Sequence, residues 1–135
     1  MKPQDEWLFK ADHDLKSAEY LLGSPSGLYD AAIYHTQQCA EKAIKAFLSF
    51  HEQPIEKSHN LIYLCQSAMT LNQEFERILT DAVLLNPYAT MFRYPEGDLL
   101  PTEAELKTAI ESASRIFNFV IAGIKGQTYT IETSP

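Results

Sequence analysis

The sequence predicts an all-α fold, an antiparallel up-and-down bundle of five helices in one domain. Three observations lead to this prediction. Apolar residues recur at spacings of three and four along most of the chain, capping residues and prolines separate the periodic segments, and alternating strand patterns are absent before residue 127. Because most connections are short, successive helices are expected to pack antiparallel.

The composition is that of an ordinary globular protein. Of the 135 residues, 45% are hydrophobic and 21% are charged, and a chain of this length buries roughly two thirds of its unfolded surface. The sequence has no run of about 18 apolar residues, and its N-terminus lacks a signal-peptide pattern. We therefore expect a cytoplasmic protein that does not contact a membrane.

Acidic residues outnumber basic ones. The formal net charge of −7 opposes non-specific attraction to phosphate backbones, so RNA is not the favoured ligand, although a small basic pocket stays compatible with this charge. Asp12 and Asp14 are two residues apart on a predicted helix and point in different directions. We interpret both as solvated charges.

The first two helices are predicted over residues 7–22 and 28–51. Gly23, Ser24 and Pro25 form the stop signal of the first, and Pro54 closes the second. At 1.5 Å per residue the second helix is about 35 Å long. This length makes it the expected spine of the domain.

The third and fourth helices are predicted to be shorter. The third begins near His59 with Ser58 as its N-cap, and Thr70 with Gln73 suggests a capping box for the fourth. Pro87 is expected to end the fourth helix.

The fifth helix has the clearest boundaries. Thr102 and Glu105 predict a capping box at its start, and Gly126 predicts its C-terminal cap. We therefore assign residues 1–126 to the bundle and residues 127–135 to a flexible C-terminal tail.

Metal, cofactor and nucleophile motifs are not evident. Cys39 and Cys65 lie in helical patterns beside apolar residues and are interpreted as buried thiols. His35 lies four residues before Cys39, but two ligands do not make a zinc site. Because the sequence also lacks a Gly-x-Ser-x-Gly elbow and a glycine-rich phosphate loop, it predicts no metal, no cofactor and no standard catalytic centre.

The predicted topology suggests where polar residues gather. If five helices alternate in direction, residues scattered over the sequence meet at one end of the bundle. The connection between residues 87 and 101 also belongs to this end, and connections of that length are often functional. The residues expected there are Trp7, Lys45, His51, His59, Tyr88, Arg93 and Tyr94.

This end has two interpretations. In the first it is a ligand site, in which the helix start beside His59 attracts an anion, Lys45 and Arg93 contact a phosphate, and Tyr88 or Tyr94 stacks on a base. In the second it is structural, with a routine capping turn around His59 and an aromatic plug at the base of the core. The residues alone leave both open.

A polar stripe on the second helix has two interpretations as well. It consists of Gln37, Gln38, Glu41 and Lys42, with Glu41 placed to form an ordinary ion pair with Lys45. The stripe is either a solvated face or a hydrogen-bonding interface with a second subunit. If the protein forms a homodimer, the second interpretation is favoured.

Several segments together resemble HEPN domains. They are Trp7 with Ala11, Asp14, Leu15 and Ala18 in the first helix, the second-helix residues 31–46, the sequence His59-Asn60-Leu61, and Tyr88 with the sequence Arg93-Tyr94-Pro95. The resemblance implies a five-helix bundle of the nucleotidyltransferase substrate-binding-subunit type, commonly dimeric. It also implies nucleotide binding, with ATP or GTP as candidates, and a toxin–antitoxin-like pairing with a minimal nucleotidyltransferase.

The chain departs from this family at the ribonuclease motif. Many relatives are metal-independent ribonucleases that use an Arg followed four to six residues later by His. Here the arginines are Arg77, Arg93 and Arg115, whereas the last histidine is His59. We therefore favour a non-catalytic binding module over an enzyme.

Two alternatives stay open. The first is a ribonuclease with a non-standard site built from His59, Arg93 and Tyr94, with the imidazole as general acid–base and the guanidinium stabilising charge. The second is a structural partner whose polar end only docks another protein.

Overall fold

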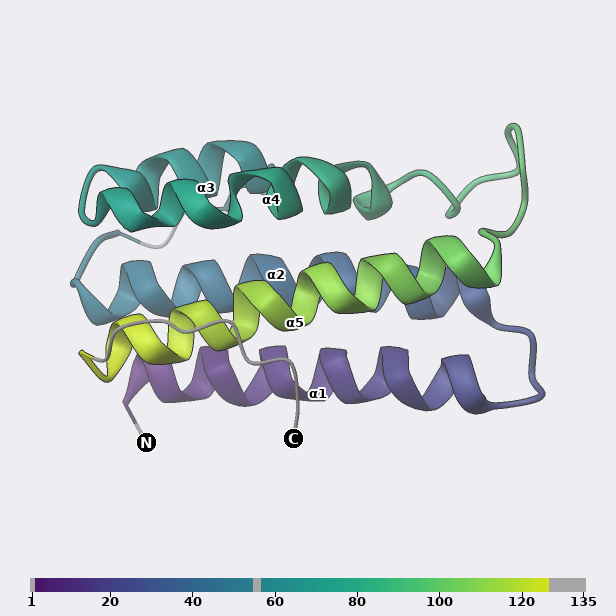
Figure 1. Cartoon of the computed structure of the whole chain (residues 1–135), viewed down its shortest axis with the longest axis horizontal. Coiled ribbons are helices and arrows are strands. Elements are labelled where there is room, and N and C mark those ends of the chain that lie inside the picture. Colours follow the sequence, from purple (N-terminus) through teal and green to yellow (C-terminus); the bar gives the residue numbers. More distant parts are fainter. Residues whose placement is uncertain (1, 55–56, 127–135) are drawn as a thin grey trace.

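The computed structural model describes residues 2–54 and 57–126, and all regular elements in these residues are helical. Five α-helices confirm the predicted fold class (Figure 1). They are α1 (Pro3–Gly23), α2 (Tyr29–Phe50), α3 (Leu61–Met69), α4 (Leu79–Leu85) and α5 (Glu103–Ile124), with 3₁₀ helices η1 (Gln73–Ile78) and η2 (Asn86–Ala89) before and after α4. Within the described part of the chain, none of these helices is long and apolar enough to span a bilayer.

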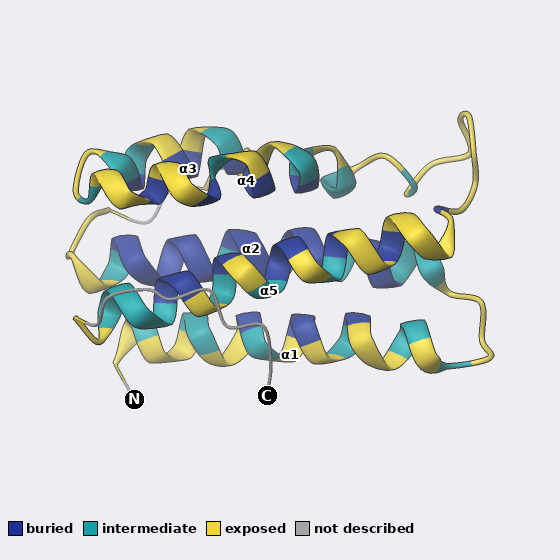
Figure 2. Ribbon diagram, viewed as in Figure 1, coloured by how far each residue is buried: buried dark blue, intermediate teal, exposed yellow. Residues whose placement is uncertain are grey.

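Helix α2 is the centre of the bundle. It packs against α1 and α5 on one side and against α3 and the α4 region on the other (Figure 1). Because neighbours surround it, most of its residues are buried (Figure 2). This confirms α2 as the predicted spine.

Local signals fix several helix ends. The Thr102 hydroxyl and the Glu105 carboxylate form the predicted capping box of α5, and Gly126 adopts a positive φ of 71° just beyond the end of this helix. The predicted N-cap of α3 was wrong by two residues, because the Asn60 side chain, not that of Ser58, accepts from the first free backbone N–H groups.

The start of the fourth helical segment also differs from the prediction. Asn72, rather than Thr70, accepts a hydrogen bond from a backbone N–H group, that of Glu74. The segment opens as the 3₁₀ helix η1, and α4 itself begins only at residue 79. Pro87 is the second residue of η2, so the helical segment continues two residues beyond it.

The connection between α2 and α3 runs back along α2. The His59 carbonyl oxygen accepts from Gln37 Nε2 at 3.1 Å, so α3 begins beside the middle of α2. Further along, the Phe75 ring packs against Phe47 near the end of α2. Helix α3 therefore runs in the same direction as α2 (Figure 1), and the strict alternation assumed for locating one polar end does not hold.

The core is continuous between η1, α2 and α5. The ring of Phe75 packs against those of Phe47 and Phe119 at centroid distances of 4.4 and 4.9 Å. Cys39 and Cys65 are buried free thiols, as predicted. Burial raises the pKa of Cys65 to about 11.

The predicted flexible tail, residues 127–135, lies outside the described residues.

Candidate functional site

One face of α2 carries a row of polar side chains along most of the helix. Positions 34, 38, 41 and 45 share a face because they are three or four residues apart. We call Tyr34, Gln38, Glu41 and Lys45 the α2 polar row. Side chains from other segments contact the row at its two ends and near its middle.

Glu41 is the centre of this row. Its side chain is only 5% exposed, and a buried carboxylate is costly unless cations and hydrogen-bond donors compensate for the lost water. Lys45 Nζ lies 3.0 Å from Oε2, Gln37 Nε2 donates to Oε1 at 3.3 Å, and His59 Nδ1 lies 3.1 Å from both oxygens. These contacts satisfy the carboxylate inside the monomer.

Lys45 is closed off by its surroundings. Its side chain is 6% exposed, its charge is balanced by Glu41, and its ammonium lies 5.7 Å from the centroid of the Trp7 ring. Little of this side chain is left to contact a phosphate. The structure therefore does not support Lys45 as a ligand-binding residue.

His59 is accessible although its partner is buried. Its side chain is 71% exposed. Because the Glu41 carboxylate can only accept, the contact assigns the proton to Nδ1 and leaves Nε2 facing solvent. A buried carboxylate that orients an exposed imidazole is an arrangement used both in binding and in acid–base catalysis.

Arg93 lies at the other end of the row. Its guanidinium carbon is 4.2 Å from the centroid of the Tyr34 ring, a stacking contact that leaves the in-plane N–H donors free. Among the described residues no carboxylate lies within 4.0 Å of this guanidinium. Arg93 is thus an exposed cation whose charge is not neutralised by these residues.

The two predicted stacking tyrosines differ. Tyr88 is half-buried, and its ring stacks on Phe92 at a centroid distance of 6.0 Å. Burial, with the nearby charge of Glu105, raises the pKa of Tyr88. Tyr94 is 63% exposed. Only Tyr94 offers an open ring face next to Arg93.

The expected gathering at one end of the bundle is wrong. Arg93 contacts Tyr34, whereas Trp7 contacts Lys45, 11 residues or about 16 Å further along α2. His51 packs against Phe47 beyond Lys45, and His59 lies between these ends. The reason is that the connection before α3 runs back along α2. The predicted residues therefore lie at different points along this helix instead of at one end of the bundle.

The predicted subunit interface is also only partly available. Gln37 and Glu41 are buried within the monomer, so they cannot contribute an exposed interface. Lys42 is partly exposed, with Nζ 2.7 Å from Asp14 of α1, and Gln38 is partly exposed and donates to Gln37 Oε1 at 2.8 Å. Of the four predicted interface residues, Gln38 and Lys42 keep accessible surface.

Sequence reasoning missed the role of Asp14. It is buried between α1 and α2, with His35 Nδ1 at 2.8 Å from one oxygen and Lys42 Nζ at 2.7 Å from the other. Burial raises the pKa of this carboxyl, but the hydrogen bonds and charges of His35 and Lys42 outweigh it and hold the pKa below its ordinary value. The available signal was its place on the apolar side of α1, between Ala11 and Leu15.

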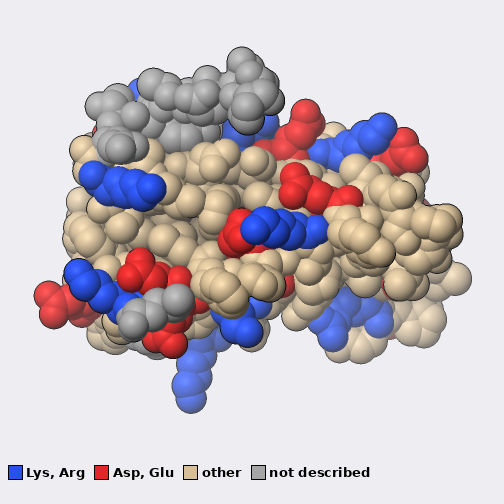
Figure 3. All heavy atoms as spheres, turned by 90° about the horizontal axis from the view of Figure 1, so that it is seen from below, with Lys and Arg blue, Asp and Glu red and all other residues tan. Residues whose placement is uncertain are grey.

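The surface charge agrees with a local rather than a broad anion site. On the face seen in Figure 3, the basic side chains of the described residues are scattered among acidic ones and form no continuous basic surface. In residues 2–54 and 57–126 there is also no group of three or more His, Cys, Asp or Glu side chains that could hold a metal ion.

Comparison with known families identifies this architecture. The profile of the HEPN domain matches residues 4–125. This chain belongs to the HEPN domain family. A Methanocaldococcus jannaschii protein named "Putative toxin" is 29% identical to it over 126 residues, which cover 86% of this chain and 82% of that protein.

Two solved structures are similar to this HEPN chain over almost its whole length. The crystal structure of an archaeal HEPN homologue has a TM-score of 0.74 and 32% identity, covering 92% of this chain and 99% of that one. The crystal structure of a Thermus thermophilus protein has a TM-score of 0.75 and 27% identity, covering 90% and 98% of the two chains.

Proposed function

We propose that this HEPN chain is a non-catalytic binding module that binds a nucleotide, ATP or GTP, and pairs with a minimal nucleotidyltransferase. The pair would work as a toxin–antitoxin-like system, and the module would act as a homodimer. The similarity to a protein named as a toxin supports the biological class. The observation that carries the ligand is Arg93, whose charge no described carboxylate neutralises.

The geometry suggests how a nucleotide would lie. A phosphate would accept hydrogen bonds from the in-plane N–H groups of Arg93, while the Tyr34 ring stacks on one face of the guanidinium. Tyr94 would supply an open ring for a base. His59 lies about seven residues, roughly 10 Å, along the same helix face from this point, within the reach of one nucleotide.

Calorimetric titration tests this ligand. ATP, GTP and their diphosphates are titrated into the wild type and into the Arg93→Ala, Tyr94→Ala and His59→Ala variants. We expect Arg93→Ala to weaken binding about tenfold or more, since a charge-assisted contact is lost. The control is Arg77→Ala, because Arg77 is also exposed and has only a long contact of 3.9 Å with Glu74. Equal loss in both arginine variants, or no binding by the wild type, refutes the site.

The protein partner is tested separately. We expect a reading frame for a small nucleotidyltransferase beside that of this chain, and we expect the two tagged proteins to co-purify after co-expression. A neighbouring enzyme that does not co-purify at any salt concentration would contradict the pairing while leaving nucleotide binding intact.

The homodimer is tested by sedimentation equilibrium. A dimer mass is expected for the wild type, and Gln38→Arg is expected to shift the mass towards the monomer if the accessible part of the predicted stripe forms the interface. Gln66→Arg, an exposed glutamine on α3, is the control. A monomeric wild type at high concentration rules out the dimer.

One observation favours a second function, a ribonuclease with a non-standard site. Glu41 orients the exposed His59 imidazole in the manner of an acid–base residue, and Arg93 and Tyr94 would stabilise charge. Labelled RNA is incubated with the wild type and with His59→Ala and Arg93→Ala. Loss of cleavage in both variants supports an enzyme, whereas cleavage that persists in both indicates a contaminating nuclease.

A further inference from the structure

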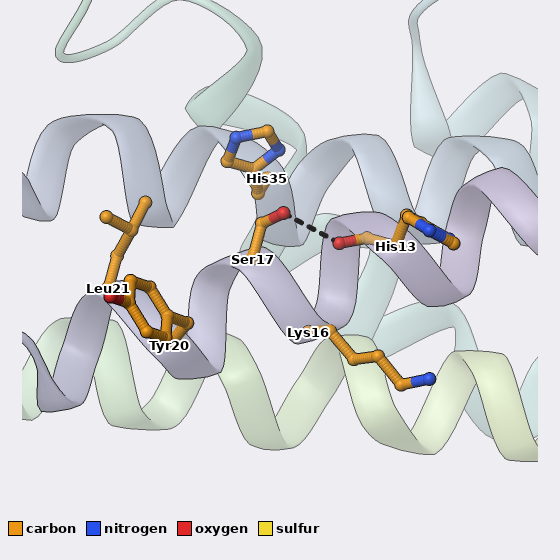
Figure 4. A pocket seen from close by; sticks show the side chains of 6 residues that line it. All are labelled: His13, Lys16, Ser17, Tyr20, Leu21 and His35. Atoms are coloured by element: carbon orange, nitrogen blue, oxygen red, sulfur yellow. Dashed lines mark hydrogen bonds between the residues drawn. The ribbon is translucent and has the colours of Figure 1, made fainter.

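A hollow between α1 and α2 lies apart from the α2 polar row. It has a volume of about 370 Å³ and is open to solvent (Figure 4). Five of its lining residues come from α1 and one from α2. They are His13, Lys16, Ser17, Tyr20, Leu21 and His35. Neither the proposed nucleotide site nor the family ribonuclease motif uses this hollow.

The imidazole of His35 presents a hydrogen-bond acceptor here. Its Nδ1 lies 2.8 Å from Asp14, a buried carboxylate that is ionised at neutral pH and can only accept. The proton of the neutral ring therefore belongs to Nδ1, and the remaining nitrogen, Nε2, carries a lone pair. Asp14 is in turn fixed by Lys42 at 2.7 Å, so the tautomer of His35 is set by packed side chains.

Two other side chains that line the hollow already donate their protons to backbone carbonyl groups. Ser17 Oγ donates its proton to the His13 carbonyl at 2.8 Å, as the dashed line in Figure 4 shows. His13 Nδ1 lies 3.0 Å from the Phe9 carbonyl oxygen, an acceptor, so its ring proton is used there. His35, Ser17 and His13 thus offer lone pairs to a ligand and no unshared proton.

The lysines around the hollow are held by carboxylates. The Lys16 ammonium is held by Asp12 at 2.8 Å, and Figure 4 shows its side chain pointing away from His35 and Ser17. Lys42 is held by Asp14. Glu19 is exposed on the same helix and adds one more negative charge. Both lysines are thus paired with carboxylates, so neither is free to bind a phosphate.

The hollow also has an aromatic wall. Tyr20 is 76% exposed, and its ring lies next to Leu21 at the edge of the hollow (Figure 4). An exposed tyrosine ring attracts a cation, and a planar cation stacks on it best. A hollow that offers hydrogen-bond acceptors and such a wall suits a flat group with several N–H donors.

We propose that this hollow binds a guanidinium group. The planar fork of a guanidinium donates to acceptors on both helices at once, His35 Nε2 and Ser17 Oγ, while one face of the group covers Tyr20. The guanidinium belongs either to a free small molecule or to an arginine side chain of a partner protein. The recognition chemistry is the same in both cases.

Titration followed by NMR of the histidine side chains tests the proposal. The probes are agmatine, a free compound that carries a guanidinium and an ammonium, N-acetyl-arginine amide, which represents a protein side chain, and putrescine, which carries two ammonium groups and matches the charge of agmatine. We expect the two guanidinium probes to shift His35 and putrescine to bind more weakly. Binding of agmatine alone indicates a free ligand, and stronger binding of the arginine amide indicates a protein partner. Equal binding of putrescine overturns the guanidinium assignment.

A matched pair of variants locates the binding. His35→Asn keeps a donor for Asp14 but removes the outward nitrogen, so we expect a fold of wild-type stability and an affinity lower by about tenfold or more. Ser17→Ala and Tyr20→Leu should each weaken binding to a smaller extent. The control is His51→Asn, an exposed histidine near the end of α2, which should bind like the wild type.

The same variants separate this proposal from the nucleotide site. Arg93→Ala should bind guanidinium normally, and His35→Asn should bind nucleotides normally. Wild-type affinity for agmatine and arginine amide in a folded His35→Asn variant, or no binding of either probe to the wild type, overturns the proposal whatever the nucleotide titrations show.

Discussion

The His59 imidazole and the Glu41 carboxylate join two segments that are 18 residues apart in the sequence. Nδ1 of the ring lies 3.1 Å from each oxygen of the carboxylate. The contact anchors the connection before α3 to the middle of α2. It also completes the set of partners without which a carboxylate could not be buried there, so one pair links the fold to the candidate site.

Replacing Glu41 by Ala should strongly destabilise the protein. The change leaves the Lys45 ammonium buried without its counter-ion and frees the connection at His59, and breaking such a pair costs about 3–5 kcal/mol. Urea unfolding followed by circular dichroism measures the loss. Glu74→Ala is the control, since Glu74 is exposed and its ion-pair contact is 3.9 Å long. A loss of less than about 1 kcal/mol for Glu41→Ala would show that water reaches this cluster.

Asp14→Asn should destabilise the protein in a pH-dependent way. Because the pKa of Asp14 is lowered by folding, its contribution is fully present above the ordinary carboxyl pKa of about 3.9 and is lost as pH falls through the folded-state value. The difference in melting temperature between wild type and variant should therefore be constant near neutral pH and shrink below about pH 4. A difference that grows below about pH 4 contradicts the hydrogen bond from His35 and the ion pair with Lys42.

The sequence predicted best the features that depend only on residues close together in the chain. The capping box of Thr102 and Glu105 needs only residues three apart, and the apolar period of α2 needs only its own helix. The N-cap of α3 was misplaced because Ser58 and Asn60 are both good caps, and the choice depends on docking: the Leu61 N–H donates to Asn86, 25 residues away.

The sequence did not predict how the proposed site residues are arranged. His59 and Arg93 both contact the α2 polar row, but at positions seven residues apart along the helix. Gln37 and Glu41 resemble surface residues in a polar stripe, and only the covering segment around His59 shows that they are internal. Asp14 was misread for the same reason, since its partners come from another helix.

The buried thiols should be protected until the protein unfolds. Cys39 and Cys65 are both buried, and burial raises the pKa of each thiol, so little thiolate forms and no reagent reaches it. Ellman's reagent at pH 8 should label neither cysteine in the native protein and both in urea. Fast labelling of one cysteine without denaturant would reveal local opening of the helix that carries it.

Removing the α5 capping box should have a smaller, separable effect. Thr102→Ala deletes the hydroxyl that accepts from Glu105 N at 3.0 Å, whereas the backbone N–H of residue 102, which donates to the Glu105 carboxylate at 2.8 Å, stays. Loss of such a cap costs about 1 kcal/mol, measurable by urea unfolding. Thr108→Ala, an exposed threonine inside α5, should be neutral or slightly stabilising because alanine is the better helix former. If both variants were destabilised equally, the loss would reflect threonine packing on this helix rather than the cap.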